Sequence, residues 1–274
     1  MEVQITKLRD NFKGTHYLIK TADNKTLFLR TWEPSKKNDM AILIFHGITA
    51  YSGPYEEVAN PLLTTGASVF GLDLRGHGLS DGIRGDYPNK KQLLSDLYEA
   101  INFLKQKFSK IILLGHSLGV LVAGFVSIHY PEDIDGLILL SAGREVKPGV
   151  YTPLSIKTKL KILFCSIFSP SKPVINYYRD GMTGLDDPLF NFKYTLRFIK
   201  IFNPKKFKFI EKLNMPVILG IGEQDEVFSI KSAEDLLNEI PCDNKEFFVM
   251  KGTKHAEFAP KSFEPLISWI NQNF

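Results

Sequence analysis

Short runs of apolar residues recur along the chain, and segments with helical spacing separate them. We expect buried strands at AILIF (41–45), SVFGLD (68–73), IILLG (111–115), GLILLS (136–141), VILGIG (217–222) and EFFVM (246–250). Helical patterns occupy 55–65, 90–107, 117–129, 230–239 and 261–270. Strands that alternate with helices predict a mostly parallel sheet with helices on both faces.

Two further patterns refine this picture. Two β-prone runs, 15–20 and 26–32, are joined by Ala-Asp-Asn-Lys, which predicts an antiparallel hairpin. Within 90–107, apolar residues fall on one helical face that should pack on the sheet, namely Leu93, Leu94, Leu97, Ile101 and Leu104.

The alternation of strands and helices breaks between Arg144 and Lys212. No run in this segment is typical of a buried strand, and the segment is rich in lysine and aromatic residues. We interpret it as an insertion that forms a helical cap. The expected organisation is therefore a core made of residues 1–143 and 213–274, with a cap or lid at 144–212.

Composition favours an ordinary globular protein in a reducing compartment. The two cysteines, Cys165 and Cys242, lie far apart and do not suggest a disulfide framework. The first residues lack the apolar run of a signal peptide, and no apolar stretch reaches the roughly 18 to 20 residues of a membrane span. We expect a cytoplasmic protein, with peripheral contact to a membrane surface as an option.

The expectation of possible membrane contact comes from the charge of the insertion. Residues 144–212 contain 14 lysines and arginines against five acids, among them Lys205, Lys206 and Lys208, and aromatic residues interleave with them. Such a mix is typical of a helix at a lipid interface. The alternative is that the aromatics pack the cap onto the core while the lysines solvate its outer side.

Gly115-His-Ser-Leu-Gly119 fits the pattern G-x-S-x-G and follows a predicted buried strand. A predicted helix begins directly after it, so Ser117 would lie on a tight strand-to-helix turn. Such a turn holds the serine hydroxyl clear of the sheet, where it can act as a nucleophile. The alternative is a glycine-rich turn with an idle serine.

A serine nucleophile needs a base, and histidine suits that role near neutral pH. Only His255 lies in a loop after the last predicted strand, at the sheet edge where reacting groups gather. The other histidines lie in the hairpin (His16), in earlier loops (His46, His77), beside the serine (His116) and at a helix end (His129). We therefore predict that His255 is the base.

An acid must orient the histidine, and the loop after 217–222 supplies one. We favour Asp225, with Glu223 as the main rival and Glu226 as another competitor. The order serine, aspartate, histidine along the chain agrees with that of the α/β-hydrolase fold.

The oxyanion of the tetrahedral intermediate needs donors that are already in place. Leu118 follows the nucleophile and offers its backbone N–H at a helix start. The loop after 41–45 reads His46-Gly-Ile-Thr49, from which we choose the backbone N–H of Ile48 as the second donor.

With these residues assembled, the chain resembles the monoacylglycerol lipase and lysophospholipase branch of the α/β-hydrolases, which are serine hydrolases. The matching pieces are His46-Gly47, the loop from Gly71 to Asp86 with Arg-Gly-His-Gly-Leu-Ser, Gly115 to Gly119, Asp225 and His255. The insertion matches loosely through Asp186-Asp-Pro-Leu189. One departure is local: Ala-Glu-Phe follows His255, which could reshape the pocket beside it.

This resemblance implies hydrolysis of carboxylic esters, most typically monoacylglycerols or lysophospholipids, through an acyl-enzyme. Similar relatives also include short-chain and aromatic-acyl carboxylesterases, and a thioesterase or peptidase would use the same triad. A non-catalytic interaction module remains the rival from another class. No H-E-x-x-H, P-loop or Cys/His cluster is present, so we expect a small ester or lipid as partner and no cofactor, metal or nucleic acid. The sequence leaves the oligomeric state open.

Overall fold

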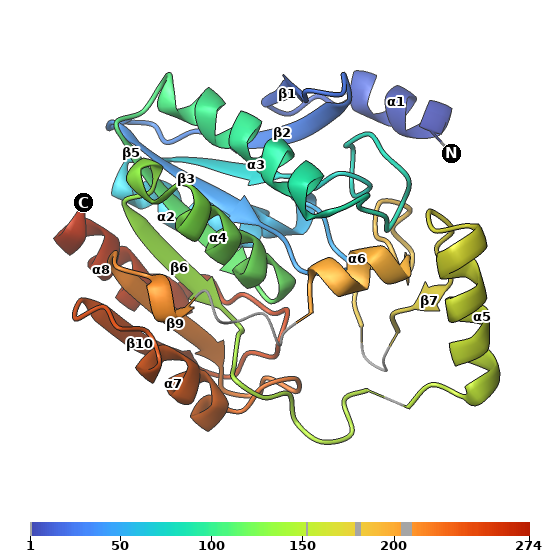
Figure 1. Cartoon of the computed structure of the whole chain (residues 1–274). Coiled ribbons are helices and arrows are strands. Elements are labelled where there is room, and N and C mark those ends of the chain that lie inside the picture. Colours follow the sequence, from blue (N-terminus) through green and yellow to red (C-terminus); the bar gives the residue numbers. More distant parts are fainter. Residues whose placement is uncertain (1, 152, 179–181, 204–209) are drawn as a thin grey trace.

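An eight-stranded sheet runs through the centre of the protein. The computed structural model describes residues 2–151, 153–178, 182–203 and 210–274 (Figure 1). The strands are β1 (His16–Lys20), β2 (Thr26–Trp32), β3 (Met40–Phe45), β4 (Ser68–Leu72), β5 (Lys110–His116), β6 (Gly136–Leu140), β9 (Val217–Gly222) and β10 (Lys245–Met250). Their order is β1-β2-β4-β3-β5-β6-β9-β10. The pairs β1–β2 and β2–β4 are antiparallel, and all others are parallel.

The parallel register brings the loops of the predicted site to one edge of the sheet. Strands β3, β5, β6 and β9 are buried on both faces, which explains their continuous apolar runs. Phe45 pairs with Gly115, and Met250 pairs with Gly222. The loops after β3, β5, β9 and β10 therefore leave the sheet at its carboxyl edge.

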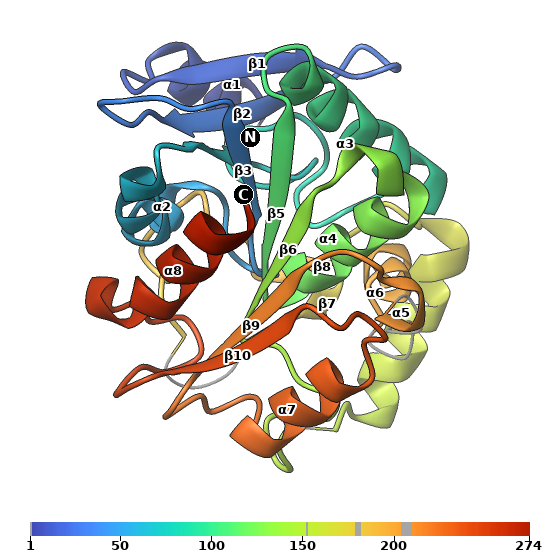
Figure 2. The ribbon, with the colours of Figure 1, turned by 90° about the vertical axis from the view of Figure 1, so that its left-hand side faces the viewer.

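Helices cover both faces of the sheet, as the alternation predicts (Figure 2). The helices of the core are α1 (Glu2–Asp10), α2 (Glu56–Leu62), α3 (Lys90–Lys105), α4 (Leu118–His129), α7 (Ile230–Asn238) and α8 (Glu264–Asn273), with 3-10 turns at Gly53–Tyr55, Leu63–Thr65, Pro131–Asp133 and Pro260–Phe263. Buried side chains of α2 and α8 pack on one face, and those of α3, α4 and α7 on the other. The predicted apolar face of α3 is confirmed: four of its five residues are buried and Leu94 packs beside them.

In the core, the structure differs from the predicted elements at three places. Helix α1 was not predicted, because long-range contacts hold it: Arg9 Nη1 donates to the carbonyl of Leu79 and to Asp81. The predicted helix 55–65 is a short α-helix between two 3-10 turns, with Pro61 inside it. The last helix reaches Asn273, beyond its predicted end.

Between β6 and β9 the chain leaves the sheet and forms elements of its own. These are α5 (Ile156–Phe168), β7 (Ile175–Asn176), β8 (Lys193–Tyr194) and α6 (Leu196–Ile201). Two helices agree with the predicted helical character, although the antiparallel pair β7–β8 was not predicted. Lys205, Lys206 and Lys208, which the charge pattern emphasised, lie outside the described residues.

Core loops anchor the later part of this segment. Asp86 accepts hydrogen bonds from Thr195 Oγ1 at 2.8 Å and from Arg197 Nε at 2.6 Å. The N–H of Asn191 donates to the carbonyl of Thr49 at 2.9 Å. The start of α6 is thus fixed to the loops after β3 and β4. No helix of the described residues is long and apolar enough to cross a bilayer.

Candidate active site

Ser117 occupies a strained turn between β5 and α4. Its φ of 53° and ψ of −115° lie in a region that residues with a Cβ rarely adopt. A Cβ on Gly119 would lie 2.0 Å from the carbonyl oxygen of Phe45, and one on Gly115 would lie 2.5 Å from that of Gly119. The close approach of the backbones therefore requires both glycines of G-x-S-x-G.

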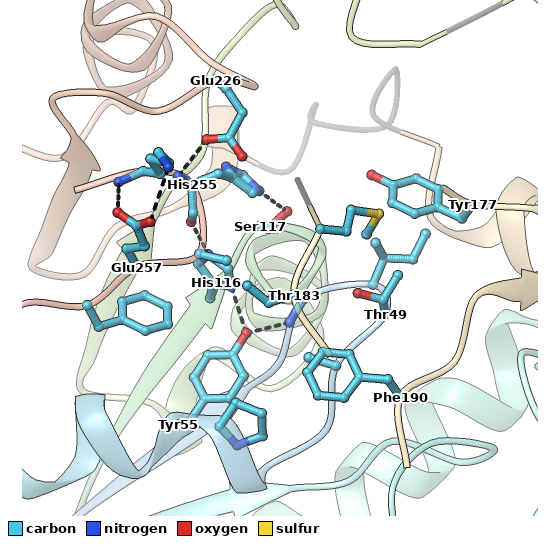
Figure 3. Close-up of a pocket in the computed structure, with 18 residues that line it drawn as sticks. Thr49, Tyr55, His116, Ser117, Tyr177, Thr183, Phe190, Glu226, His255 and Glu257 are labelled. Atoms are coloured by element: carbon cyan, nitrogen blue, oxygen red, sulfur yellow. Dashed lines mark hydrogen bonds and ion pairs between the residues drawn. The ribbon is translucent and has the colours of Figure 1, made fainter. Parts of the chain in front are cut away.

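Ser117, His255 and Asp225 form one hydrogen-bonded row. Nε2 of His255 lies 2.9 Å from Oγ of Ser117 (Figure 3). On the other side of the ring, Nδ1 of His255 lies 2.9 Å from Oδ2 of Asp225. With the proton on Nδ1, the ring donates to Asp225 and leaves Nε2 to accept the serine proton. The structure thus brings together the three side chains that the sequence predicts to react.

Asp225 is ionised at neutral pH in this arrangement. Burial by itself would raise its pKa, but the hydrogen bond and charge attraction of His255 outweigh it. The N–H groups of Phe228 and Val227 also donate to Oδ1, at 2.9 and 2.7 Å, and the net effect is a lowered pKa. The carboxylate is therefore suited to hold the imidazole in one tautomer.

The two competing acids contact the main chain of the histidine loop. Glu223 is exposed and accepts the N–H of Gly252 at 3.0 Å. Glu226 accepts the N–H of His255 itself at 2.9 Å. Asp225 is thus the acid placed on the ring of His255, while the other two steady the loop that carries it.

Ile48 and Leu118, whose N–H groups are the predicted oxyanion donors, both line the hollow at Ser117. Leu118 is the first residue of α4, where a backbone N–H has no partner within the helix. Across the described residues, neither N–H donates to a protein acceptor. Both N–H groups therefore stay candidates for the oxyanion donors.

A relay of hydrogen bonds that was not predicted from the sequence connects the loop after β3 with the loop that carries His255. Burial lowers the pKa of His116 to about 3, so its ring is neutral. Its Nε2–H donates to the carbonyl of His255 at 2.8 Å, and its Nδ1 accepts the hydroxyl of Tyr55 at 2.6 Å. Tyr55 in turn accepts the N–H of Gly47 at 2.7 Å, so the loop before Ile48 and the loop of His255 share one support (Figure 3).

The distinctive loop from Gly71 to Asp86 contributes to the site indirectly, because its contacts hold the loop after β3 in place. Asp73 accepts the N–H of Ser52 at 2.6 Å and the N–H of Leu79 at 2.7 Å. Nε2 of His46 accepts the N–H of Leu74 at 3.1 Å. These buried contacts fix the loop after β3, which carries the predicted oxyanion donor Ile48.

Two hollows meet at Ser117. The larger has a volume of about 470 Å³ and is mostly apolar, with Leu121, Val146, Ile175, Phe202 and Phe228 among its walls. The smaller has a volume of about 120 Å³ and is more polar, with Thr49, Thr183, Glu226, Lys254 and Glu257 among its walls. Within the described part of the chain, no group of three His, Cys, Asp or Glu side chains is arranged to hold a metal.

Most of the chain is similar to known proteins. The family described as "Serine aminopeptidase, S33" matches residues 36–259. The monoglyceride lipase of Rattus norvegicus is 26% identical over 252 residues, which are 85% of this chain and 81% of that protein. An abhydrolase domain-containing protein of Dictyostelium discoideum is 26% identical over 92% of this chain, which spans 28% of that longer protein.

A solved structure agrees with the fold. A soluble variant of the monoglyceride lipase of Saccharomyces cerevisiae, in complex with a substrate analog, superposes with a TM-score of 0.76 at 19% identity. The match covers 96% of this chain and 98% of that chain. The mostly parallel sheet, the strained serine turn and the extent of the family match lead to one conclusion: this chain belongs to the α/β-hydrolase family described as "Serine aminopeptidase, S33", and it is similar to monoglyceride lipases.

Proposed function

We propose that this protein is a serine esterase that hydrolyses monoacylglycerol or lysophospholipid esters. The observation that carries the proposal is the row from Ser117 through His255 to Asp225, built on a turn that strains the serine backbone. Such strain is costly and persists where the surrounding structure enforces it, most often at reactive sites.

The geometry supports a two-step reaction. His255 Nε2 takes the proton of Ser117 as Oγ attacks the ester carbonyl, and the N–H groups of Ile48 and Leu118 hold the resulting oxyanion. The intermediate collapses as the carbon–oxygen bond breaks and His255 returns the proton to the leaving alcohol. A water molecule, deprotonated by His255, then attacks the carbonyl of the acyl-enzyme; the acid leaves as the bond to Ser117 Oγ breaks, and His255 returns the proton to Oγ. Asp225 stabilises the imidazolium in both steps.

The two hollows suggest how the substrate lies. The apolar hollow of about 470 Å³ lies in the size range of small-molecule sites and suits an acyl chain. The smaller, more polar hollow suits the alcohol part of the ester. The similarity to monoglyceride lipases supports this class of substrate.

Residues 144–212 are proposed to act as a cap on a core formed by 1–143 and 213–274. The larger hollow has walls from both parts: Leu118 and Leu121 come from α4, whereas Ile175 and Phe202 come from the inserted segment. Changes in this segment would therefore alter acyl preference without touching the row at Ser117.

A peptidase is the second candidate, because the family description names an aminopeptidase. An aminopeptidase must compensate the positive charge of a free amino group beside the scissile bond. Among the described residues that line the larger hollow, none is charged, so an ammonium ion there would lose its hydration without a partner. Glu226 and Glu257 line the smaller hollow and offer carboxylates to such an ion. The larger hollow therefore suits an uncharged acyl group, which a thioesterase or a short-chain or aromatic-acyl esterase would place there too, and the choice between an ester and an aminoacyl amide is left to the measured rates.

Covalent labelling and a rate panel test the proposal. A fluorophosphonate should label the protein and fail to label Ser117→Ala, whereas absent labelling would indicate a non-catalytic module. Initial rates should then be measured over esters of graded acyl length, monoacylglycerols, lysophospholipids, thioesters and aminoacyl anilides. Highest kcat/KM on long-chain acylglycerols or lysophospholipids supports the proposal, and highest kcat/KM on aminoacyl anilides overturns it.

A further inference from the structure

Tyr194 of β8 joins the inserted segment to the core loop that carries Ile48. Its side chain is fully buried, and its hydroxyl donates to the main-chain carbonyl of Ile48. The same hydroxyl lies 2.7 Å from the carbonyl oxygen of Asn191, which belongs to the inserted segment. A tyrosine has a single hydroxyl proton, so this proton lies between one carbonyl of the core and one of the insertion. The hydroxyl thus links the two parts of the chain.

Neighbouring rings hold the side chain of Tyr194 in this position. The ring of His77 stacks on it with 5.9 Å between centroids, and the ring of Phe198 lies 4.7 Å away. Nε2 of His77 is farther from the hydroxyl than either carbonyl, at 3.5 Å. Burial raises the pKa of the Tyr194 hydroxyl, so it keeps its proton at neutral pH. Tyr194 is therefore a neutral donor with a fixed orientation.

The inserted segment holds the same core loop at two further places. The carbonyl of Thr49 accepts the N–H of Asn191 at 2.9 Å. The hydroxyl of Tyr51 donates to Oδ2 of Asp187, also at 2.9 Å. Together with the hydroxyl contact of Tyr194, these two bonds form what we call the seam. The seam fixes three residues of the loop after β3 to the insertion.

The seam matters because Ile48 carries a proposed oxyanion donor. Contacts within the core fix the residue before it: the N–H of Gly47 donates to Tyr55, and the carbonyl of Gly47 accepts Nδ1–H of His46 at 2.8 Å. The contact of Tyr194 fixes the carbonyl of Ile48 itself. The N–H of Ile48 therefore lies between one anchor from the core and one from the insertion. An oxyanion donor is effective only when it is already aimed at the charge that develops.

We propose that Tyr194 is a positioning residue that aims the N–H of Ile48 at the oxyanion, so that the insertion contributes to turnover as well as to the walls of the hollows. The proposal rests on the proposed esterase function. Tyr194 is not among the described residues that line either hollow, so it acts through Ile48 and not on the substrate. Its hydroxyl should then affect the transition state and leave the binding of substrate nearly unchanged.

Steady-state kinetics of Tyr194→Phe on a soluble ester provide the first test. The variant keeps the ring and its packing and removes only the hydroxyl. We expect kcat to fall by about tenfold or more, because a misaligned donor loses its interaction with the oxyanion. KM should change by less than about twofold, since the hollows keep their walls. An unchanged kcat, or a change confined to KM, would overturn the proposal.

Inhibitors that do and do not form an oxyanion provide the second test. When a trifluoromethyl ketone reacts, Oγ of Ser117 bonds to the carbonyl carbon, the serine proton moves to His255, and the carbonyl electrons leave a negative charge on oxygen. The corresponding secondary alcohol fills the same hollow without this step. Tyr194→Phe should weaken inhibition by the ketone about tenfold and inhibition by the alcohol hardly at all. Equal weakening of both would mean that Tyr194 only shapes the hollow.

Two further tyrosines supply controls. Tyr130→Phe removes a hydroxyl bond to a main-chain carbonyl, that of Leu94 at 3.2 Å, at the end of α4 remote from Ser117. It should keep the kcat of the parent, and an equal loss there would overturn the proposal. Urea unfolding shows which variants fold. If Tyr194→Phe does not, Tyr51→Phe decides, because it removes another bond of the seam: kcat should fall about threefold with KM kept, and an unchanged kcat would overturn the proposal.

The parent protein separates failure of this inference from failure of the proposed function. Ester hydrolysis by the parent together with an unchanged kcat in Tyr194→Phe would overturn the positioning role alone. Hydrolysis of aminoacyl anilides and of no ester would overturn the proposed function. The role of Tyr194 would then be measured on the anilide, because an amide passes through the same tetrahedral oxyanion. A parent that cleaves none of these substrates would overturn both.

Discussion

The main-chain carbonyl of His255 accepts a hydrogen bond from Nε2 of His116, 2.8 Å away, so the neighbour of the proposed nucleophile holds the backbone of the proposed base. Glu226 accepts the N–H of the same residue. The peptide groups on both sides of the imidazole are therefore fixed independently of the ring's own contacts. Preorganisation of this kind keeps the reacting groups aligned before substrate arrives.

Tyr55→Phe should weaken both stability and turnover. The change leaves the N–H of Gly47 and Nδ1 of His116 buried without their partner, which costs about 1 to 3 kcal/mol for each unsatisfied group. Urea unfolding measures the first effect. Steady-state kinetics on a soluble ester should show a fall in kcat with little change in KM, because Tyr55 acts through the loops it joins. An unchanged kcat would show that the relay does not position the site.

Ser117→Ala and His255→Ala should each lower kcat by several orders of magnitude, and the double variant should be little worse. Groups that act as one unit lose their whole contribution when either is removed. Rates on a soluble ester for the two single variants and the double variant provide the measurement. Losses that multiply would mean that the two side chains act in separate steps.

Asp225→Asn should preserve folding and reduce kcat by about 10⁴-fold, as in the serine protease precedent. The amide cannot stabilise an imidazolium and favours the wrong tautomer. Glu223→Gln is the matched control, since the Glu223 side chain accepts the backbone N–H of Gly252 rather than contacting the ring of His255, and it should retain most activity. A dead Glu223→Gln beside an active Asp225→Asn would transfer the role to Glu223.

The free energy of unfolding should fall as the pH is lowered from about 6.5 toward 4. Burial lowers the pKa of His46, His77 and His116 in the folded protein, to about 3 for His116. An unfolded chain protonates histidine near about 6.5, so protons bind the unfolded state preferentially in this window. Each neutral histidine contributes a slope of about 1.4 kcal/mol per pH unit.

Urea midpoints measured across this pH range provide the check, and a flat profile would contradict the neutral, buried assignment of the three rings.

Much of the fold follows from local pattern, because strands buried on both faces need continuous apolar runs and their helices need one apolar stripe. All the central strands and the N-terminal hairpin were predicted in this way and are confirmed. Helix α1 was not, since its contacts to Leu79 and Asp81 come from residues about 70 positions away.

The residues of the site also fall into those that the sequence predicts and those that it does not. Ser117, Asp225 and His255 were found because each follows a strand whose end must lie at the same edge of the sheet, and their roles stay predictions. Tyr55 carries no such signal: it lies in a helical segment 61 residues from the ring it contacts.

The close contacts around Gly115 and Gly119 have a consequence for evolution. Their lack of a Cβ is demanded by the carbonyl of Phe45 and by the turn itself, irrespective of what Ser117 does. A descendant that had abandoned hydrolysis would still need both glycines to fold. The presence of these two glycines in a relative therefore indicates common descent and the same turn. Whether that relative is active should be judged from its residues at the positions of Ser117, His255 and Asp225.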